Sequence, residues 1–162
     1  MHRSLLAALL AALPLAAAGA ADIACPPSIT TPADTGAHAG WRVVARPSPT
    51  GFPFRGPERP GTNALSGISV VDGPASDVEA AAPGTLMPDE GASGRMRPPS
   101  VTQRWDVSYA NPRGFLLICH YRGTATVLAM VLPAGIRECR QTLPVDQRGQ
   151  IADRGPVTAL CR

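Results

Sequence analysis

Residues 115–121 read FLLICHY, and residues 124–132 read TATVLAMVL. Nearly every position in the two stretches is apolar, and neither is longer than an ordinary strand. Continuous apolar runs of this length are typical of central strands that are covered on both faces. Arg122-Gly123 lies between them and favours a turn. The two stretches therefore predict the centre of a β-sheet.

Shorter and more polar strands are expected on both sides of this centre. Residues 101–109 alternate with a period of two, which places Trp105 and Tyr109 on one mostly apolar face. Turn sequences at 111–114 and 133–135 flank the central pair. Two further strands are expected, at 136–143 and 157–161. Because each strand follows the previous one after a short turn, the order predicts an antiparallel meander.

The first half of the chain adds weaker elements. We expect a short strand at 41–46 and another at 64–71, the second with Leu65, Gly67, Ser69 and Val71 on one face. Ser76 and Glu79 have the spacing of a capping box, in which the serine caps the helix start and the glutamate reaches back to it. A short helix over 77–82 is therefore expected, and Pro83-Gly84 ends it.

The remaining segments are rich in proline and glycine. The chain has 18 prolines and 16 glycines, which argues against long helices because proline lacks an amide donor and glycine costs backbone entropy. We expect an irregular start over 22–40 and two long exposed loops at 46–63 and 83–100. The fold class predicted is mainly β (α+β): a small antiparallel meander with one short helix, two long loops and disulfides.

The N-terminus has the three parts of a secretion signal. Arg3 is basic, Leu5–Leu15 is apolar apart from Pro14, and small residues precede cleavage after Ala20 or Ala21. The apolar run is too short to span a bilayer. We expect residues 1–21 to be removed, leaving 22–162 as one small periplasmic or secreted domain with no stable membrane insertion.

Four cysteines remain after this cleavage: Cys25, Cys119, Cys139 and Cys161. An even number in a short exported chain predicts two disulfides. In a regular meander a third strand separates Cys119 from Cys139, whereas Cys139 and Cys161 lie on neighbouring strands. The pairing 25–119 with 139–161 is therefore favoured, and 25–161 with 119–139 remains an alternative.

The charges and motifs exclude several functions. All 15 basic residues are arginine, the net charge is only +3, and the charges are scattered, so no nucleic-acid footprint is present. No CxxC pair, phosphate loop or dinucleotide fingerprint occurs. Cys119 and His120 are neighbours on a strand and point to opposite faces, so they do not form a thiol dyad. We expect no metal and no cofactor.

Several spaced motifs resemble those of a known family. They are Cys25-Pro26, Gly40-Trp41, Val71-Asp72-Gly73-Pro74, Leu86-Met87-Pro88, Trp105, Cys119-His120-Tyr121 with Gly123-Thr124, Leu132-Pro133, Cys139 and Cys161. The pattern resembles a family of small exported proteins of Gram-negative bacteria to which no activity is assigned. The resemblance implies a periplasmic or secreted location and transfers no catalytic residue.

A non-enzymatic, protein-binding role is the function that these observations favour. The concrete version is an inhibitor or immunity-type protein directed at an envelope protein such as a cell-wall hydrolase or toxin. Long loops are suited to presenting contacts, and aromatic residues and arginine dominate interface energetics. The residues expected at the interface are Phe52, Phe54 and Arg55 in one loop and Arg95, Met96 and Arg97 in the other.

Two other functions stay open at this point. One is a small-ligand or glycan-binding module, which an exposed Trp41 or Trp105 would favour. The other is an envelope enzyme whose site joins His120 to Asp106 or Asp72.

Overall fold

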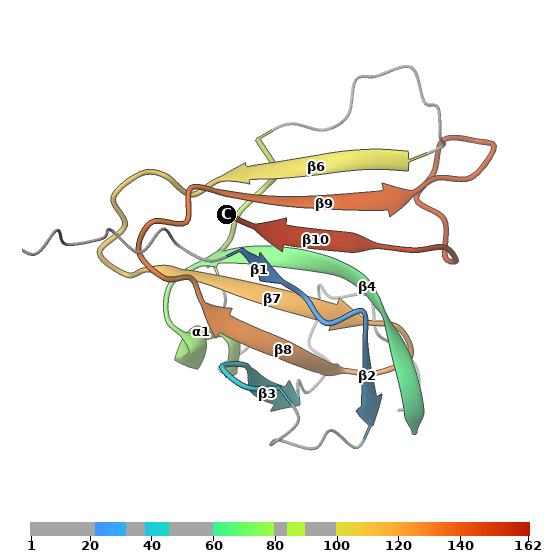
Figure 1. Cartoon of the computed structure of the whole chain (residues 1–162), viewed down its shortest axis with the longest axis horizontal. Helices are drawn as coiled ribbons and strands as arrows, with labels where there is room; N and C mark the ends of the chain where they lie inside the picture. The colour runs from blue at the N-terminus through green and yellow to red at the C-terminus, as the bar shows by residue number, and fades with distance from the viewer. Residues whose placement is uncertain (1–21, 32–37, 46–59, 80–83, 90–99) are drawn as a thin grey trace, which may run out of the picture.

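Two antiparallel sheets make up the structure, a computed structural model that describes residues 22–31, 38–45, 60–79, 84–89 and 100–162 (Figure 1). The four-stranded sheet has the order β1 (Ile23–Ala24), β10 (Thr158–Cys161), β9 (Glu138–Pro144), β6 (Ser100–Asp106). The six-stranded sheet has the order β2 (Ser28–Thr31), β4 (Gly61–Asp72), β7 (Phe115–Tyr121), β8 (Thr126–Val131), β3 (Arg42–Ala45), with β5 (Gly84–Thr85) added on β4. The short helix α1 is Ala75–Glu79. The predicted fold class is confirmed.

The strand connections differ from a single continuous meander. Consecutive strands pair in β7–β8 and in β9–β10, but β6 pairs with β9, and β7 lies between β4 and β8. The physical reason lies in the different sequence patterns of β7 and β6. β7 is apolar on both faces and needs cover on both, whereas β6 alternates and suits a sheet with one face open to solvent. The chain therefore crosses between the sheets after β6 and again after β8.

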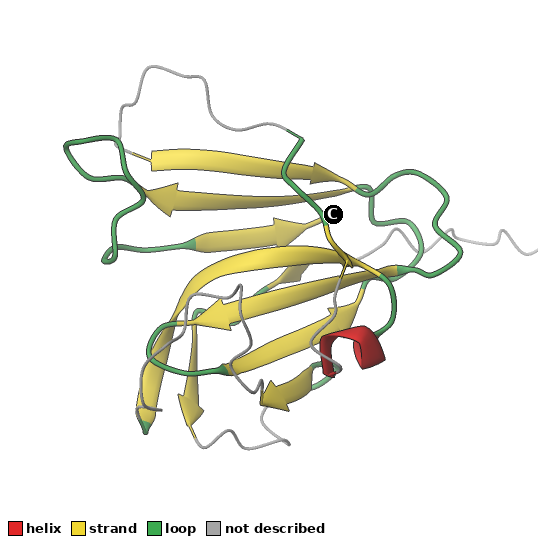
Figure 2. Cartoon of the chain, turned by 180° about the vertical axis from the view of Figure 1, so that it is seen from behind, coloured by secondary structure: helices red, strands yellow, loops and turns green. Residues whose placement is uncertain are grey.

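The main core fills the space between the sheets. The four-stranded sheet contributes Trp105, Cys139 and Cys161, and the six-stranded sheet contributes residues such as Leu117 and Cys119. A second cluster covers the other face of the six-stranded sheet and joins β3, β4, β7 and β8 to Val78 of α1. Figure 2 shows the helix on that side, away from the four-stranded sheet. Cover on both faces of β7, expected from FLLICHY, is confirmed.

A β-bulge in β4 changes which residues face the main core. The register against β7 shifts between Leu65 and Gly67, and Gly67 has φ +157°. One extra residue reverses the alternation beyond it. Leu65 and Ile68 therefore both enter the main core, while Val71 joins the second cluster. The expectation that Leu65 and Val71 share a face is wrong for this reason.

Several smaller expectations need correction. Residues 22–40 are not wholly irregular, because β1 pairs with β10 and β2 pairs with β4. Part of each expected loop is also strand, since Gly61–Asn63 belongs to β4 and Gly84–Thr85 forms β5. The helix begins at Ala75, so Ser76 lies inside it and not at its N-cap. Among the described residues, no helix has the length and apolar character needed to cross a membrane.

Two disulfides are present, in the pairing that was favoured. One lies within the four-stranded sheet, and the other joins the two sheets. Cys139 and Cys161 are directly opposite each other on β9 and β10, with their Cα atoms 4.0 Å apart. Cys25, which follows β1, is bonded to Cys119 of β7 with a Cα–Cα distance of 5.9 Å. The second bridge therefore joins the N-terminal segment beside the four-stranded sheet to the middle of the six-stranded sheet.

Candidate protein-binding surface

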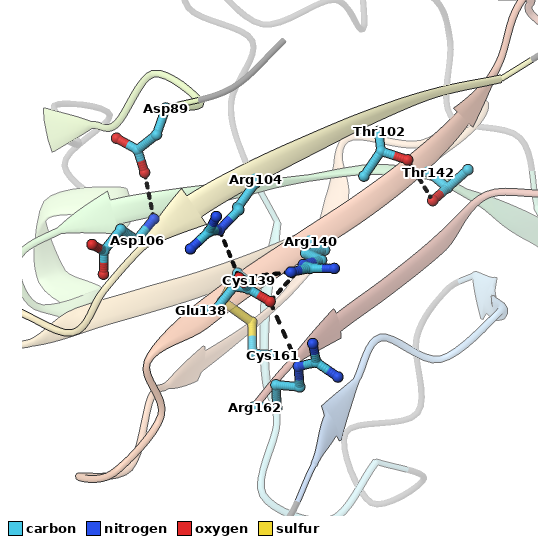
Figure 3. Close-up of polar contacts among 10 residues, drawn as sticks. All are labelled: Asp89, Thr102, Arg104, Asp106, Glu138, Cys139, Arg140, Thr142, Cys161 and Arg162. Carbon is cyan, nitrogen blue, oxygen red and sulfur yellow. Dashed lines mark hydrogen bonds and ion pairs between the residues drawn. A yellow bond between two sulfur atoms is a disulfide. The ribbon is translucent and has the colours of Figure 1, made fainter. Parts of the chain in front are cut away.

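Three arginines surround one carboxylate on the outer face of the four-stranded sheet (Figure 3). Glu138 opens β9, and its side chain is only 11 % exposed. Its Oε2 lies 2.6 Å from Nε of Arg104 on β6, and its Oε1 lies 2.5 Å from Nε of Arg140 on β9. Nε of Arg162, just beyond β10, lies 3.5 Å from Oε1. We call Arg104, Glu138, Arg140 and Arg162 the arginine cluster.

Strand alternation places this cluster on the outer face. Trp105 and Cys139 are paired across β6 and β9 and point into the core, so their neighbours along each strand point outward. The same register sets Arg104 opposite Arg140. Three strands that are far apart in the sequence thereby bring their charges together.

The carboxylate at the centre of the cluster is ionised, and Asp106 lies directly opposite it on β6. A hydrogen bond from Arg140 and the charges of all three arginines lower the pKa of Glu138 from its ordinary value of 4.5, against the opposing effect of partial burial. The carboxylate is therefore charged at neutral pH and offsets one of the three guanidinium charges. The side chains of Arg104, Arg140 and Arg162 are 39 %, 47 % and 58 % exposed.

A pocket of about 420 Å³ opens at the same end of the molecule, between the two segments that cross from one sheet to the other. Its lining includes Val107, Tyr109, Phe115, Leu132, Ile136 and Arg137. Because β6 ends at Asp106, Tyr109 lies outside the strand and is 52 % exposed, contrary to its expected place on the apolar face. Its ring packs edge-on against Phe115, with centroids 5.0 Å apart. An anchored, exposed tyrosine is a typical contact residue in protein interfaces.

A second pocket, of about 560 Å³, lies between the turn that joins β7 to β8 and the connection from β9 to β10. Its lining includes Tyr121, Arg122 and the exposed Ile151. Its lining residues include no charged cluster comparable to the one around Glu138.

The interface residues expected from the sequence lie outside the described residues. Phe52, Phe54 and Arg55 fall in 46–59, and Arg95, Met96 and Arg97 fall in 90–99. The residues on either side of the second segment are described, however, and they lie at β6. Asp89 donates its backbone N–H to the carbonyl of Arg104 at 2.8 Å, and its carboxylate accepts the N–H of Asp106. Asp89 and Ser100, the described residues on either side of this segment, therefore both lie at β6.

The arginine cluster could not be recognised from the sequence, along which the charges are scattered. Glu138 and Arg140 are two residues apart, and this spacing alone places them on one face of a strand. Arg104 and Arg162 join them only through the pairing of β6, β9 and β10. The expected neighbourhood of Cys139 and Cys161 was the available signal, because it also brings Glu138 close to Arg162.

The described residues give little support to the two alternative functions. Trp41 is half-buried and packs against the main core. Trp105 is 3 % exposed and belongs to the core, and its indole N–H donates to the carbonyl of Leu86, so it is not a glycan platform. His120 pairs with the hydroxyl of Ser69 at 2.9 Å. Asp72 lies opposite Phe115, about five residues or roughly 17 Å along β7 from His120, and Asp106 is exposed on the other sheet. Within the described ranges, no group of three or more His, Cys, Asp or Glu side chains is arranged to hold a metal.

Comparison with known proteins identifies the family. Residues 58–162 match the type VI secretion system Tli immunity protein family. The chain belongs to this family. A relative from Azospirillum brasilense, an uncharacterized 16.3 kDa protein in the trpG 5′ region, is 34 % identical over 145 residues and covers 87 % of this chain and 85 % of its own. No solved structure matches the chain.

Membership in the Tli immunity family assigns the chain a protein-binding role. Immunity proteins of this family bind a partner effector toxin, so the chain is an immunity-type, inhibitory binding module. The matched residues include all of β4 and every later strand, which means that the family covers the arginine cluster and both pockets. The immunity-type function expected from the sequence is confirmed.

Proposed function

We propose that the chain neutralises a type VI toxin in the periplasm by direct, non-catalytic binding. The match of residues 58–162 to the Tli immunity family carries this proposal. Residues 1–21 have the pattern of a secretion signal. The two disulfides fit an oxidising compartment such as the periplasm. The target is a toxin that acts in the envelope, with a cell-wall hydrolase as the first candidate to test.

Inhibition by occupation of the toxin's surface is the mechanism that this scaffold supports. Cover on both faces of the six-stranded sheet and two disulfides fix the backbone before a partner arrives. A rigid binder loses less conformational entropy on association than a flexible one. The chain then blocks the toxin without making or breaking a bond.

The two proline- and glycine-rich loops remain proposed contact sites. Phe52, Phe54 and Arg55 belong to one, and Arg95, Met96 and Arg97 to the other. Asp89 is hydrogen-bonded to β6 and Ser100 is its first residue, so the described residues that flank the second loop both lie at the four-stranded sheet. Deleting 50–58 or 92–98 tests each loop separately, and unchanged capture of the partner by both deletion variants would contradict this assignment.

The test of the function begins with the oxidised mature chain, residues 22–162, used as bait on periplasmic and culture extracts of the source bacterium. The recovered toxin is then purified and its activity titrated with the chain. A binding module abolishes activity at one equivalent, whereas an enzyme that inactivates the toxin would act at far lower ratios. Failure of the purified toxin to bind at any ratio would exclude the proposal.

Protection of living cells supplies the second test. A strain that directs the toxin to its periplasm should survive when the full-length chain is co-expressed. A variant that lacks residues 1–21 is the control, because it keeps residues 22–162 but loses the expected route of export to the compartment in which the disulfides form. Equal protection by both variants would contradict the periplasmic site of action.

A further inference from the structure

The connection between β9 and β10 is longer than the pairing of these strands requires. It comprises residues 145–157, whereas neighbouring antiparallel strands are usually joined by about two to five residues. The strands are held together without it, because they pair in continuous register and the disulfide between Cys139 and Cys161 links them. Ordering each additional residue costs about 1–2 kcal/mol of backbone conformational entropy. We call the first part of this connection, residues 145–151, the outer hairpin.

The outer hairpin has a backbone fixed by its own hydrogen bonds. Val145 and Ile151 form an antiparallel bridge at its base. Asp146 donates its backbone N–H to the carbonyl of Gln150 at 2.7 Å. Its carboxylate oxygen Oδ1 accepts the backbone N–H groups of Arg148 and Gln150 at 2.8 and 2.9 Å. The tip is therefore ordered from within and not by contact with the core.

The base of the outer hairpin is also fastened to the rest of the fold. The N–H of Ala152 donates to the carbonyl of Pro144 at 2.8 Å, directly beyond the bridge. Farther along the connection, Nη2 of Arg122 donates to the carbonyl of Gly155 at 3.3 Å. These bonds set the direction in which the outer hairpin leaves the four-stranded sheet.

Folding gains little from the side chains of the outer hairpin. Val145 is buried, but residues 146–151 are exposed, and Ile151 is 56 % exposed. A cavity of about 560 Å³ lies between Ile151 and Tyr121 of β7, and the connection extends beyond the ends of β9 and β10 (Figure 1). Burial of apolar area therefore does not explain why this segment is ordered.

An ordered segment that protrudes and buries little surface is suited to recognition. Backbone that is fixed before binding loses less conformational entropy when a partner arrives. The bonds to Asp146 Oδ1 use the backbone N–H groups of Arg148 and Gln150, so the side chains of these residues lie outside that network. Gln147 is exposed beside them. Long loops of this kind are usually functional when they are ordered.

Shape and hydrogen bonding, not charge, define the partner that fits the outer hairpin. The whole connection is formally neutral, because Asp146 and Asp153 offset Arg148 and Arg154. The glutamine amides both donate and accept hydrogen bonds, and Ile151 adds an apolar contact. A protruding hairpin of this composition fits a concave site that is mostly apolar with a few polar groups, which is the usual character of a substrate-binding cleft.

We propose that the outer hairpin inserts into the substrate-binding cleft of the partner toxin, with Gln147, Arg148 and Gln150 at the tip and Ile151 at the rim. This inference rests on the proposed function and adds the place of the contact and the mode of inhibition. The chain blocks the toxin because the outer hairpin occupies the space that the substrate needs.

The first test removes the tip and keeps the strands. Residues 146–150 are replaced with Asn-Gly, which joins Val145 to Ile151 through a two-residue turn that suits a β-hairpin. We expect the affinity for the purified toxin to fall at least about a hundredfold. The melting temperature of the oxidised variant should stay close to that of the unsubstituted chain, because the removed residues are exposed.

Point variants test the contact without shortening the chain. Arg148→Ala removes a side chain at the tip, and Arg154→Ala is the matched control, because it removes an exposed arginine from the later part of the same connection. We expect R148A to weaken binding at least about tenfold and R154A to stay within about threefold of the unsubstituted chain.

A second pair of variants tests the order of the tip. Asp146→Ala removes the acceptor of two backbone N–H groups, whereas Asp146→Asn removes the same charge and keeps an oxygen at that position. We expect D146A to bind several-fold more weakly, with a less favourable binding entropy in calorimetry, and D146N to bind like the unsubstituted chain. Equal binding entropies for the two variants would contradict the role given to Asp146.

The outcomes distinguish this inference from the function on which it rests. If the unsubstituted chain does not bind the toxin, both are wrong. If it binds and the shortened variant binds equally well, the outer hairpin is wrong and the immunity function stands. Insertion into the cleft further requires that the concentration of chain giving half-inhibition rise with the concentration of the substrate used in the activity titration. A half-inhibition concentration that is independent of substrate would overturn the cleft as the place of contact.

Discussion

The two sheets of this molecule differ in how many of their faces are buried. The six-stranded sheet is covered on one side by the other sheet and on the other by a cluster that includes Val78 of α1. Within the described residues, the four-stranded sheet buries its inner face and exposes Arg140 and Leu160 on the outer one. A sheet covered twice supplies stability, and a sheet covered once retains a surface for recognition. Changes in the first should therefore affect folding, and changes on the outer face of the second should affect binding.

The largest loss of stability is expected when the disulfide between Cys25 and Cys119 is removed, because it joins the N-terminal segment beside the four-stranded sheet to the six-stranded sheet. It closes a loop with a sequence separation of 94 residues, for which chain entropy predicts about 4–5 kcal/mol of stability. Replacing both cysteines with serine should lower the free energy of unfolding by about that amount. The double replacement of Cys139 and Cys161, separated by 22 residues, should cost about 3 kcal/mol. Denaturant unfolding measures both, and equal losses would contradict the entropic account.

The next prediction compares the loss of stability when one residue of each sheet is replaced with alanine. Ile118 is fully buried in the second cluster, whereas Leu160 is 37 % exposed on the outer face of the four-stranded sheet. Ile118→Ala should destabilise the fold by about 3–4 kcal/mol because it removes buried methyl groups and leaves a cavity. Leu160→Ala should cost less than about 1 kcal/mol. Similar losses in thermal unfolding would show that the outer face is covered in solution.

A smaller effect is expected from the hydrogen bond that crosses the interface between the sheets. The side-chain carbonyl of Gln141 on β9 accepts the N–H of Ile68 at 2.8 Å, beside the bulge in β4. Gln141→Leu fills a similar volume but leaves that buried N–H without its acceptor, which costs about 1–3 kcal/mol. A loss below about 0.5 kcal/mol for the leucine variant would contradict the role given to this bond.

The smallest effect is expected at the arginine cluster. Glu138→Gln should cost only about 1 kcal/mol at pH 7, because the arginines are partly exposed. The lowered pKa of Glu138 means that the unfolded chain binds a proton more readily than the folded one, so its contribution is present above pH 4.5. That contribution is lost as the pH falls through the folded pKa. The stabilities of the two proteins should therefore converge as the pH falls below 4.5, the ordinary pKa of glutamate, and a gap that widens in acid would contradict this sign.

Local patterns predicted the strands that carry strong apolar signals. FLLICHY became β7 with the expected bounds, and alternation placed Trp105 on the face that packs into the core. The short strands β1, β2 and β5 were not predicted, because two to four residues are too few to show a periodic pattern. Ser76 was misplaced as a cap because the helix starts after Pro74, whose carbonyl accepts the N–H of Asp77.

The candidate site was less predictable than the strands that form it. The loops that contain Phe52, Phe54 and Arg55, and Arg95, Met96 and Arg97, were chosen because their composition suits exposed contacts. The arginine cluster depends instead on strand partners, and Arg104 and Arg162 become neighbours of Glu138 only after β6, β9 and β10 have paired. Spacing along the chain does not report such proximity.

The sequence by itself determined where the strongly patterned strands lie, which disulfide pairing is favoured and the immunity-type function that the family match confirms. These features depend on local periodicity and on cysteines that neighbouring strands bring together. Only the tertiary structure decided that β6 pairs with β9 and not with β7. It also decided that, within the described residues, one face of the four-stranded sheet is exposed to solvent. Which strands pair and which faces are buried is settled by competition among all the apolar surfaces of the chain, and no single segment contains that information.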